Sequence, residues 1–214
     1  MKDRLNLFKE CNAPCMVVAE VSGSIQGKAK IPLSKRPILN VDEWKTFYNK
    51  ISEISKYMED SGVPLAYHHH MGTVVQSQED TERLIDNTSD TVKLLIDTGH
   101  MMFAGGDFVK IAKDYSSRLH HVHCKDIRKD VLDMSLKNDL SFIDAFFAGA
   151  FTVPGDGCIN YENFLKILKN FNYKGWLVVE AEQDPKKANP FEYGKIGFNH
   201  LKKIALDCGF EITR

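Results

Sequence analysis

Four short clusters of histidine, carboxylate and lysine residues hold the side chains of this sequence best suited to chemistry. Each cluster follows a short apolar run, and in chain order they are His68-His69-His70, Asp97-Thr98-Gly99-His100, His121-Val122-His123-Cys124-Lys125 and Glu180-Ala181-Glu182. Such side chains are too polar for the interior of a core strand, but they suit its end, where they meet solvent or a ligand. Four polar strand ends predict one site at the rim of a parallel barrel.

Three of these residues offer the mixed oxygen and nitrogen ligands of a metal site. Asp97, His123 and Glu180 lie on three separate predicted strands. Such a set suits a divalent metal such as manganese, cobalt, iron or zinc. A site of this kind with open positions polarises a ketone or hydroxyl oxygen. The alternative for each residue taken singly is structural, because an Asp at a strand end is commonly a helix cap or a loop anchor.

The same clusters contain candidates for proton transfer. Lys125 comes two residues after His123, where it could stabilise an enolate or carry a proton, although a surface lysine is the alternative. His100 is a candidate general acid or base, and Glu182 should share the face of Glu180. Strand alternation predicts that His68 and His70 share a face while His69 points away. We also expect His121 to face the helix layer and His123 the barrel centre.

The elements that would position these side chains follow from hydrophobic periodicity. Apolar runs without alternation are typical of buried parallel strands, and residues with helical spacing separate them. Right-handed crossovers then bring all the carboxyl ends of the strands to one face. The predicted strands are 15–19, 63–66, 92–96, 118–122 and 176–179, and the predicted helices are 2–12, 41–60, 79–88, 107–115, 139–148, 161–171 and 190–207.

Composition is that of an ordinary globular domain. The chain has 214 residues, 43% of them hydrophobic and 27% charged, with a formal net charge of -1. We therefore expect one domain, residues 1–214, without the basic surface that nucleic acid requires. No apolar run is long enough for a membrane span and no secretory signal opens the chain, so we expect no membrane partner. Five scattered cysteines do not suggest a disulfide framework, which favours a cytoplasmic location.

Six segments together resemble the inosose dehydratases, a family within the xylose-isomerase-like sugar isomerase/epimerase superfamily of TIM barrels. The similarity extends from about residue 14 to the C-terminus, and its motifs are specific to that family. The segments are 23–27 (GSIQG), 67–73 (YHHHMGT), 97–107 (DTGHMMFAGGD), 121–126 (HVHCKD), 151–157 (FTVPGDG) and 176–185 (WLVVEAEQDP).

The resemblance implies a hydro-lyase that dehydrates 2-keto-myo-inositol (scyllo-inosose), a cyclic polyol ketone, to 3D-trihydroxycyclohexane-1,2-dione in inositol catabolism. It implies a divalent metal, manganese or cobalt. The metal-binding residues of the superfamily fall on Asp97, His123 and Glu180, and His68 stands where the superfamily usually has a glutamate. We favour His68 as the fourth ligand; the alternative is three protein ligands. The candidate acids and bases, in no assigned order, are His70, His100, Lys125 and Glu182.

The resemblance also implies a (β/α)8 barrel, of which this sequence carries only about five βα units. The alternatives are a truncated, inactive remnant and a homo-oligomer in which a second chain supplies strands. Another metal-dependent isomerase or epimerase of the superfamily remains a rival function. A DNA-repair endonuclease, also known in the superfamily, is disfavoured by the near-zero charge.

Overall fold

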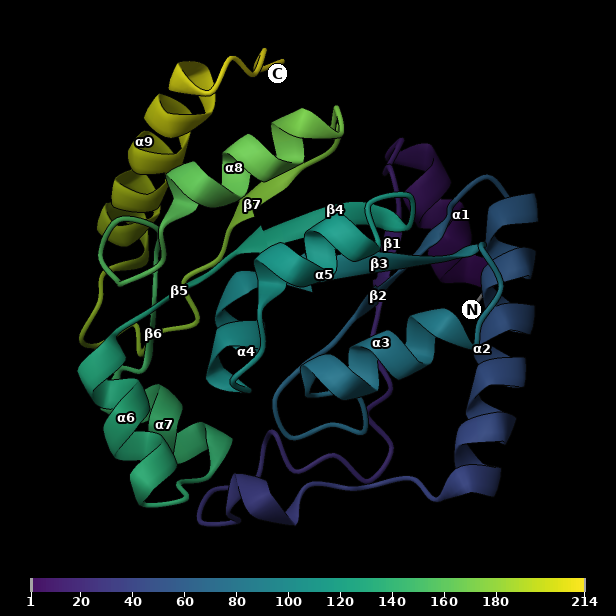
Figure 1. The fold of residues 1–214 in the computed structure, drawn as a ribbon, viewed down its shortest axis with the longest axis horizontal. Helices are drawn as coiled ribbons and strands as arrows, with labels where there is room; N and C mark the ends of the chain where they lie inside the picture. The colour runs from purple at the N-terminus through teal and green to yellow at the C-terminus, as the bar shows by residue number, and fades with distance from the viewer. Residues whose placement is uncertain (1, 214) are drawn as a thin grey trace.

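A sheet of five parallel strands forms the centre of the molecule (Figure 1). The computed structural model describes residues 2–213. In spatial order the strands are β1 (Met16–Val18), β2 (Leu65–His68), β3 (Val92–Asp97), β4 (Leu119–Cys124) and β7 (Leu177–Val179). Spatial order follows chain order, as expected for an incomplete (β/α)8 barrel. Among residues 2–213, no further strand pairs with the outer edges of β1 and β7.

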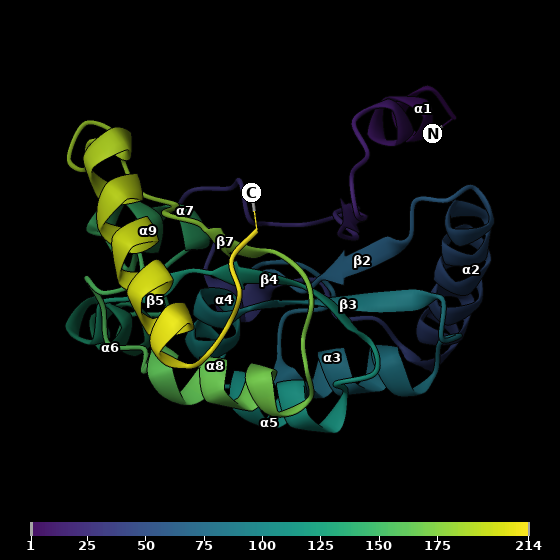
Figure 2. The same cartoon turned by 90° about the horizontal axis from the view of Figure 1, so that it is seen from above.

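Helices connect and cover the strands. Seen from above, α3, α5 and α8 lie along one face of the sheet, and the opposite face is the barrel interior (Figure 2). The helices are α1 (Lys2–Glu10), α2 (Val41–Asp60), α3 (Gln78–Asp86), α4 (Thr98–Phe103), α5 (Phe108–Asp114), α6 (Lys129–Lys137), α7 (Phe142–Ala148), α8 (Tyr161–Asn170) and α9 (Pro190–Asp207), with a 3-10 turn η1 (Leu33–Lys35). Strands β5 (Asp126–Ile127) and β6 (Phe151–Thr152) form a separate antiparallel pair.

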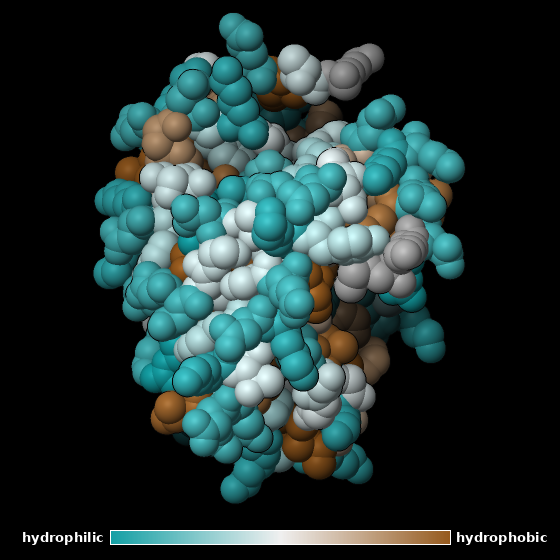
Figure 3. Space-filling model, turned by 90° about the vertical axis from the view of Figure 1, so that its right-hand side faces the viewer, coloured by the Kyte–Doolittle hydropathy of each residue, from teal (hydrophilic) through white to brown (hydrophobic). Residues whose placement is uncertain are grey.

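Helix α2 begins and ends where local chemistry requires. The side chain of Asn40 accepts hydrogen bonds from the backbone N–H groups of Asp42 and Glu43, and the carboxylate of Glu43 accepts one from the N–H of Asn40. This capping box satisfies otherwise unpaired donors. Gly62, with φ +82°, ends the helix in the left-handed conformation that glycine tolerates. The outer surface over α2 is mainly hydrophilic, with small apolar areas (Figure 3).

Strand alternation separates two packing layers. Leu94, Ile96 and Val122 point to the helix side, where they pack with Leu84 and Phe164 in the main core. On the interior side, Cys15, Ala66 and Leu95 form a small cluster of their own. The interior layer is where barrel enzymes of this architecture place their sites.

A second hydrophobic cluster lies beside the carboxyl ends of the strands. Phe142 of α7 and Phe151 of β6 pack there with Leu33 from the long loop after β1. The backbone N–H of Leu33 donates to the carbonyl of Leu140 at 3.2 Å. This loop therefore reaches from β1 to the segment before α7.

The structure confirms the five predicted strands and the seven predicted helices, with ends shifted by a few residues. The predictions omitted α4, α6 and the β5–β6 pair. Among the described residues, no helix is both long and apolar enough to cross a bilayer.

Candidate metal centre

Four neighbouring strands bring the four predicted metal ligands together on the interior face. His68 ends β2, Asp97 ends β3, His123 lies in β4 opposite Asp97, and Glu180 follows β7 directly. The Oδ2 atom of Asp97 lies 3.5 Å from Nε2 of His68 and 3.5 Å from Nδ1 of His123. Nδ1 of His123 lies 3.0 Å from Oε2 of Glu180. Ligand atoms of Asp97, His123 and Glu180 all lie within 4.8 Å of one another, and His68 joins them through its contact with Asp97. The role of the four residues as ligands stays a prediction.

The atoms that converge are also buried polar atoms without a hydrogen-bond partner. They are Nε2 of His68, Oδ2 of Asp97, Nδ1 of His123 and Oε2 of Glu180. Their mutual contacts lie within ion-pair distance but lack the alignment of a hydrogen bond. Because an unpaired buried polar atom is costly, the three atoms of Asp97, His123 and Glu180 fit a cation bound between them, with His68 beside Asp97 as a further candidate ligand.

Asp97 has two separate tasks. Its Oδ1 atom accepts a hydrogen bond from the backbone N–H of His100 at 2.8 Å and thereby caps α4. Its Oδ2 atom is left for the cluster. The helix-cap alternative for this residue is therefore correct as well, and it leaves one oxygen available to a metal.

Burial and neighbouring charges set the ionisation of the candidate ligands. Burial would raise the pKa of Asp97, but interactions led by the Lys125 ammonium hold it well below its usual range. Burial likewise opposes ionisation of Glu180, while His123 and Lys125 lower its pKa. Burial alone would lower the pKa of His123, but attraction to Asp97 and Glu180 prevails and raises it to about 9. Both carboxyl groups are thus ionised at neutral pH.

The four candidate acids and bases form a second group beside the first. Nζ of Lys125 lies 2.9 Å from Nε2 of His100 and 2.5 Å from Oε2 of Glu182. Glu182 also lies 3.3 Å from Nε2 of His100 and 3.8 Å from Nε2 of His70. Their catalytic roles stay a prediction, but their proximity makes proton exchange among them feasible.

Lys125 joins the two groups. Its ammonium is 3.3 Å from Oδ2 of Asp97 and 3.1 Å from Oε2 of Glu180, and its side chain is completely buried. The alternative of a surface lysine is therefore wrong. Burial lowers the pKa of Lys125, but Asp97, Glu182 and Glu180 outweigh it and raise the pKa, so the ammonium persists. Burial, together with His70 and Lys125, lowers the pKa of His100 to about 3 and keeps that imidazole neutral.

The prediction that His121 faces the helix layer is wrong. Residues two apart on a strand point to the same face, so His121 points to the interior below His123. Their ring centroids are 5.4 Å apart, and Nδ1 of His121 lies 3.8 Å from Sγ of Cys15. His69 does point away from the site, and its Nε2 atom accepts the backbone N–H of Asp97 at 3.2 Å.

Two aromatic residues that the sequence analysis did not predict line the site. The ring of Phe142 lies 5.1 Å from that of His70, and the ring of Phe151 lies 5.3 Å from that of His100. Nζ of Lys125 also lies 5.5 Å from the centre of the Phe151 ring. Phe151 belongs to one of the family-like segments, whereas no sequence signal marks Phe142, because its place depends on how α7 packs.

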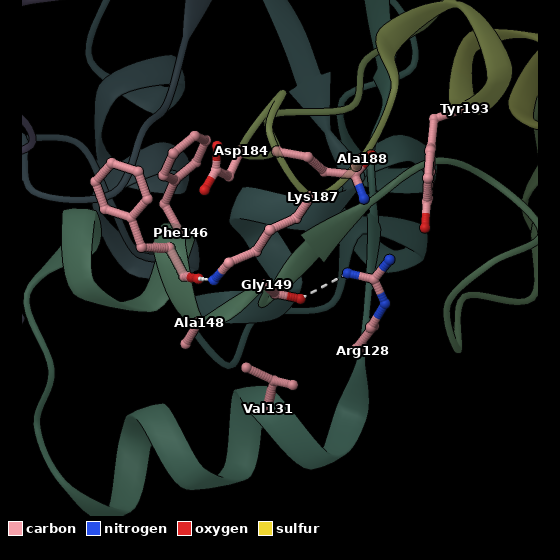
Figure 4. Close-up of a pocket in the computed structure, with 11 residues that line it drawn as sticks. Arg128, Val131, Phe146, Ala148, Gly149, Asp184, Lys187, Ala188 and Tyr193 are labelled. Carbon is pink, nitrogen blue, oxygen red and sulfur yellow. Dashed lines mark hydrogen bonds between the residues drawn. The ribbon is translucent and has the colours of Figure 1, made fainter.

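A separate hollow of about 290 Å³ lies beside α7 (Figure 4). Its lining includes none of the eight predicted site residues. The guanidinium of Arg128 donates to the carbonyl of Gly149 at 2.8 Å, and Nζ of Lys187 donates to that of Phe147 at 2.7 Å. These cations therefore satisfy main-chain carbonyls at the end of α7.

Sequence comparison links the chain to one family. The family described as xylose isomerase-like TIM barrel matches residues 1–204. The chain is 43% identical over 209 residues to the rhizopine catabolism protein MocC of Rhizobium meliloti, covering 98% of this chain and 64% of that protein. It is 47% identical over 190 residues to an inosose dehydratase of Bacillus cereus (strain AH820), covering 88% of this chain and 64% of that protein. The chain thus spans about 64% of the length of these relatives.

Solved structures show the same fold at low identity. The probable 3-DHS dehydratase AsbF of Bacillus anthracis superposes with a TM-score of 0.68 at 13% identity, covering 94% of this chain and 66% of that chain. The IOLI protein, whose crystal structure holds a zinc atom, superposes with a TM-score of 0.64 at 18% identity, covering 97% of this chain and 66% of that chain.

Proposed function

Because the chain belongs to the xylose isomerase-like TIM barrel family, we propose that it acts as a hydro-lyase on 2-keto-myo-inositol. The product is 3D-trihydroxycyclohexane-1,2-dione, and the setting is cytoplasmic inositol catabolism. The observation that carries the proposal is a cluster of unpartnered histidine and carboxylate atoms around Asp97, beside a buried lysine. The similarity to inosose dehydratases, over 64% of the length of the relative from Bacillus cereus, supports the choice of substrate.

His68, Asp97, His123 and Glu180 would hold the divalent metal, which we propose to be manganese or cobalt. When bound, such an ion supplies Lewis acidity toward the ketone oxygen. His123 must lose its proton to bind a metal, because only the neutral imidazole is a ligand. His68 is already suited, since burial lowers its pKa.

The chain's own residues would move the protons. Dehydration removes a proton from the carbon beside the ketone and a hydroxyl from the next carbon, and the two leave as water without a redox partner. His70, His100 and Glu182 are the candidate bases. Burial keeps His100 neutral, and the Lys125 ammonium outweighs burial and keeps Glu182 ionised. Lys125 would donate a hydrogen bond to the developing oxyanion or assist the departing hydroxyl, as a buried ammonium can.

A direct assay tests this function. The chain is incubated with 2-keto-myo-inositol and manganese or cobalt, and the dione is followed by its absorbance. We expect turnover that chelation abolishes and that Lys125→Met lowers by at least about 100-fold, the usual share of a proton-transfer group. Absence of dione under saturating metal, in a folded chain, would refute the proposal. An epimer formed without loss of water would favour a sugar epimerase instead.

A second candidate is a role in rhizopine catabolism, because the similarity to MocC covers 98% of this chain. Metal-dependent turnover of a rhizopine, with no turnover of 2-keto-myo-inositol, would favour it. In either case the partner would be a small polyol, without nucleic acid or membrane. A homo-oligomer is part of the proposal, and analytical ultracentrifugation tests it.

A further inference from the structure

We propose that Thr98 and Gly99, the first two residues of α4, are positioning residues for Lys125. They hold the lysine ammonium at the junction between the metal ligands and the acid–base group. This inference rests on the proposed function only in giving Lys125 a part in the reaction. The placement itself can be tested without turnover.

Gly99 leaves the space through which the Lys125 side chain passes. A Cβ atom at residue 99 would lie 2.7 Å from Cγ of Lys125 and 3.0 Å from both its Cβ and its Cδ. Real Cβ atoms do not approach that closely, so any other residue would push the lysine aside. Gly99 is not among the glycines with positive φ, which means that space rather than backbone conformation requires glycine here.

Thr98 fixes the main chain of Lys125. Its hydroxyl donates to the carbonyl of Lys125 at 2.7 Å and accepts the backbone N–H of Lys125 at 3.1 Å. The hydroxyl of Tyr161, from α8, lies 2.9 Å away and completes the set. Lys125 follows the last residue of β4, so these bonds hold the lysine backbone just beyond the strand.

At the far end of the side chain, the centre of the Phe151 ring lies 5.5 Å from Nζ. With its stem against Gly99, the lysine places its ammonium beside His100, Asp97, Glu180 and Glu182 at once. A lysine free to choose other rotamers would meet these groups only part of the time. One short segment, 97–100, therefore supplies four functions in order. Asp97 is a candidate ligand, Thr98 binds the main chain of Lys125, Gly99 leaves room for the lysine side chain, and His100 is a candidate base.

The test compares Gly99→Ala with Gly194→Ala. Gly194 lies in α9, and a Cβ atom there would meet nothing within 4 Å, so it controls for glycine replacement in a helix. Lysine acylation read by mass spectrometry reports on the burial of Lys125. We expect Lys125 to be unreactive in the natural chain and in Gly194→Ala, and its reactivity to rise on the order of tenfold in Gly99→Ala. We expect kcat to fall on the order of 100-fold in Gly99→Ala and to stay near the natural value in Gly194→Ala.

Thr98→Val and Thr98→Ser provide a second pair in case Gly99→Ala does not fold. We expect Thr98→Val to expose Lys125 to acylation and Thr98→Ser, which keeps the hydroxyl, to restore protection. Unchanged Lys125 reactivity in both Gly99→Ala and Thr98→Val would overturn the inference, as would an equal rise in Gly194→Ala. If the natural chain shows no turnover, the proposed function fails, and the acylation result still decides whether the segment positions Lys125.

Discussion

Replacing Asp97 with asparagine removes the central negative charge of the site and leaves the shape almost unchanged. Oδ2 of Asp97 lies 3.3 Å from Nζ of Lys125 and 3.5 Å from a ring nitrogen of each of His68 and His123. At the effective dielectric constant of a protein, about 20, one such pair of unit charges is worth about 4 kcal/mol before desolvation is subtracted. Breaking a buried ion pair from one side costs about 3–5 kcal/mol in net stability.

We expect Asp97→Asn to lower the free energy of unfolding of the metal-free protein by about 3 kcal/mol, the lower end of that range. The reason is that Glu180 and Glu182 still neutralise Lys125 in the variant. Manganese affinity should fall at least about 100-fold, because even residues outside the ligand set change affinity by 10–100-fold. Urea unfolding with a chelator gives the first quantity, and calorimetric titration gives the second.

Asp107→Asn is the matched control. Asp107 caps α5 by accepting from the backbone N–H groups of Val109 and Lys110, both at 2.9 Å, and it lies outside the site. Asparagine caps about as well as aspartate, so this variant should stay within about 0.5 kcal/mol of the natural protein. Equal losses in the two variants would show that the charge of Asp97 contributes no more to stability than that of an ordinary helix-capping aspartate. Unchanged manganese affinity in Asp97→Asn would remove Asp97 from the ligand set.

The pH dependence of the difference checks its electrostatic origin. The folded-state pKa of Asp97 is depressed, so its stabilisation is present above the ordinary aspartate pKa near 4 and is lost as pH falls through the depressed value. The natural chain and Asp97→Asn should therefore converge in stability only in strong acid. Convergence already at pH 6 would refute the reasoning.

Three other predictions concern the metal, the neutral histidines and a buried arginine. Manganese at about 100 times its Kd should raise the free energy of unfolding by about 2.7 kcal/mol. Its binding at neutral pH should also release a proton from His123, whose pKa is raised to about 9. Calorimetry in buffers of different ionisation enthalpy measures the proton release, and its absence would contradict the prediction. The pKa values of His69 and His100 are lowered to about 3, so both rings should remain neutral in the folded protein at pH 5. Because the same rings gain a proton in the unfolded chain below about pH 6.5, the free energy of unfolding should fall by about 2 kcal/mol per ring between pH 7 and 5. Imidazolium signals from these rings at pH 6 in nitrogen-15 NMR would disprove this. Arg118→Lys should destabilise by about 2 kcal/mol, because the arginine donates to the carbonyl of Val92 from Nε at 2.9 Å and from Nη2 at 2.8 Å; a loss below about 0.5 kcal/mol in urea unfolding would contradict it.

The strands and most helices could be predicted because their signals are local. Helix α2, predicted at residues 41–60, spans Val41–Asp60 because its apolar spacing and its acidic first turn agree. Helix α4 was missed because its start signal is Asp97, which also serves the site, and its six residues are too few to show periodicity. Short elements of this kind depend on tertiary contacts rather than on propensity.

Those features of the site that follow from strand order and side-chain alternation could be predicted. The candidate ligands meet because parallel strands end on one face, and His69 points away because side chains alternate. The burial of Lys125 was not predictable, because it depends on Gly99 and on Phe151 from a distant strand. The expectation for His121 failed through misapplied alternation, not through missing information.

The distribution of the candidate ligands over successive strands has a consequence for synthesis on the ribosome. Translation delivers His68, Asp97 and His123 before Glu180, and Glu180 follows β7, an edge strand of the sheet. The candidate ligand set is therefore complete only after β7 has left the ribosome and docked on β4. A nascent chain that binds its metal ion through all four residues would therefore bind it only after β7 is synthesised. Metal binding during translation would then report that β7 has paired with β4.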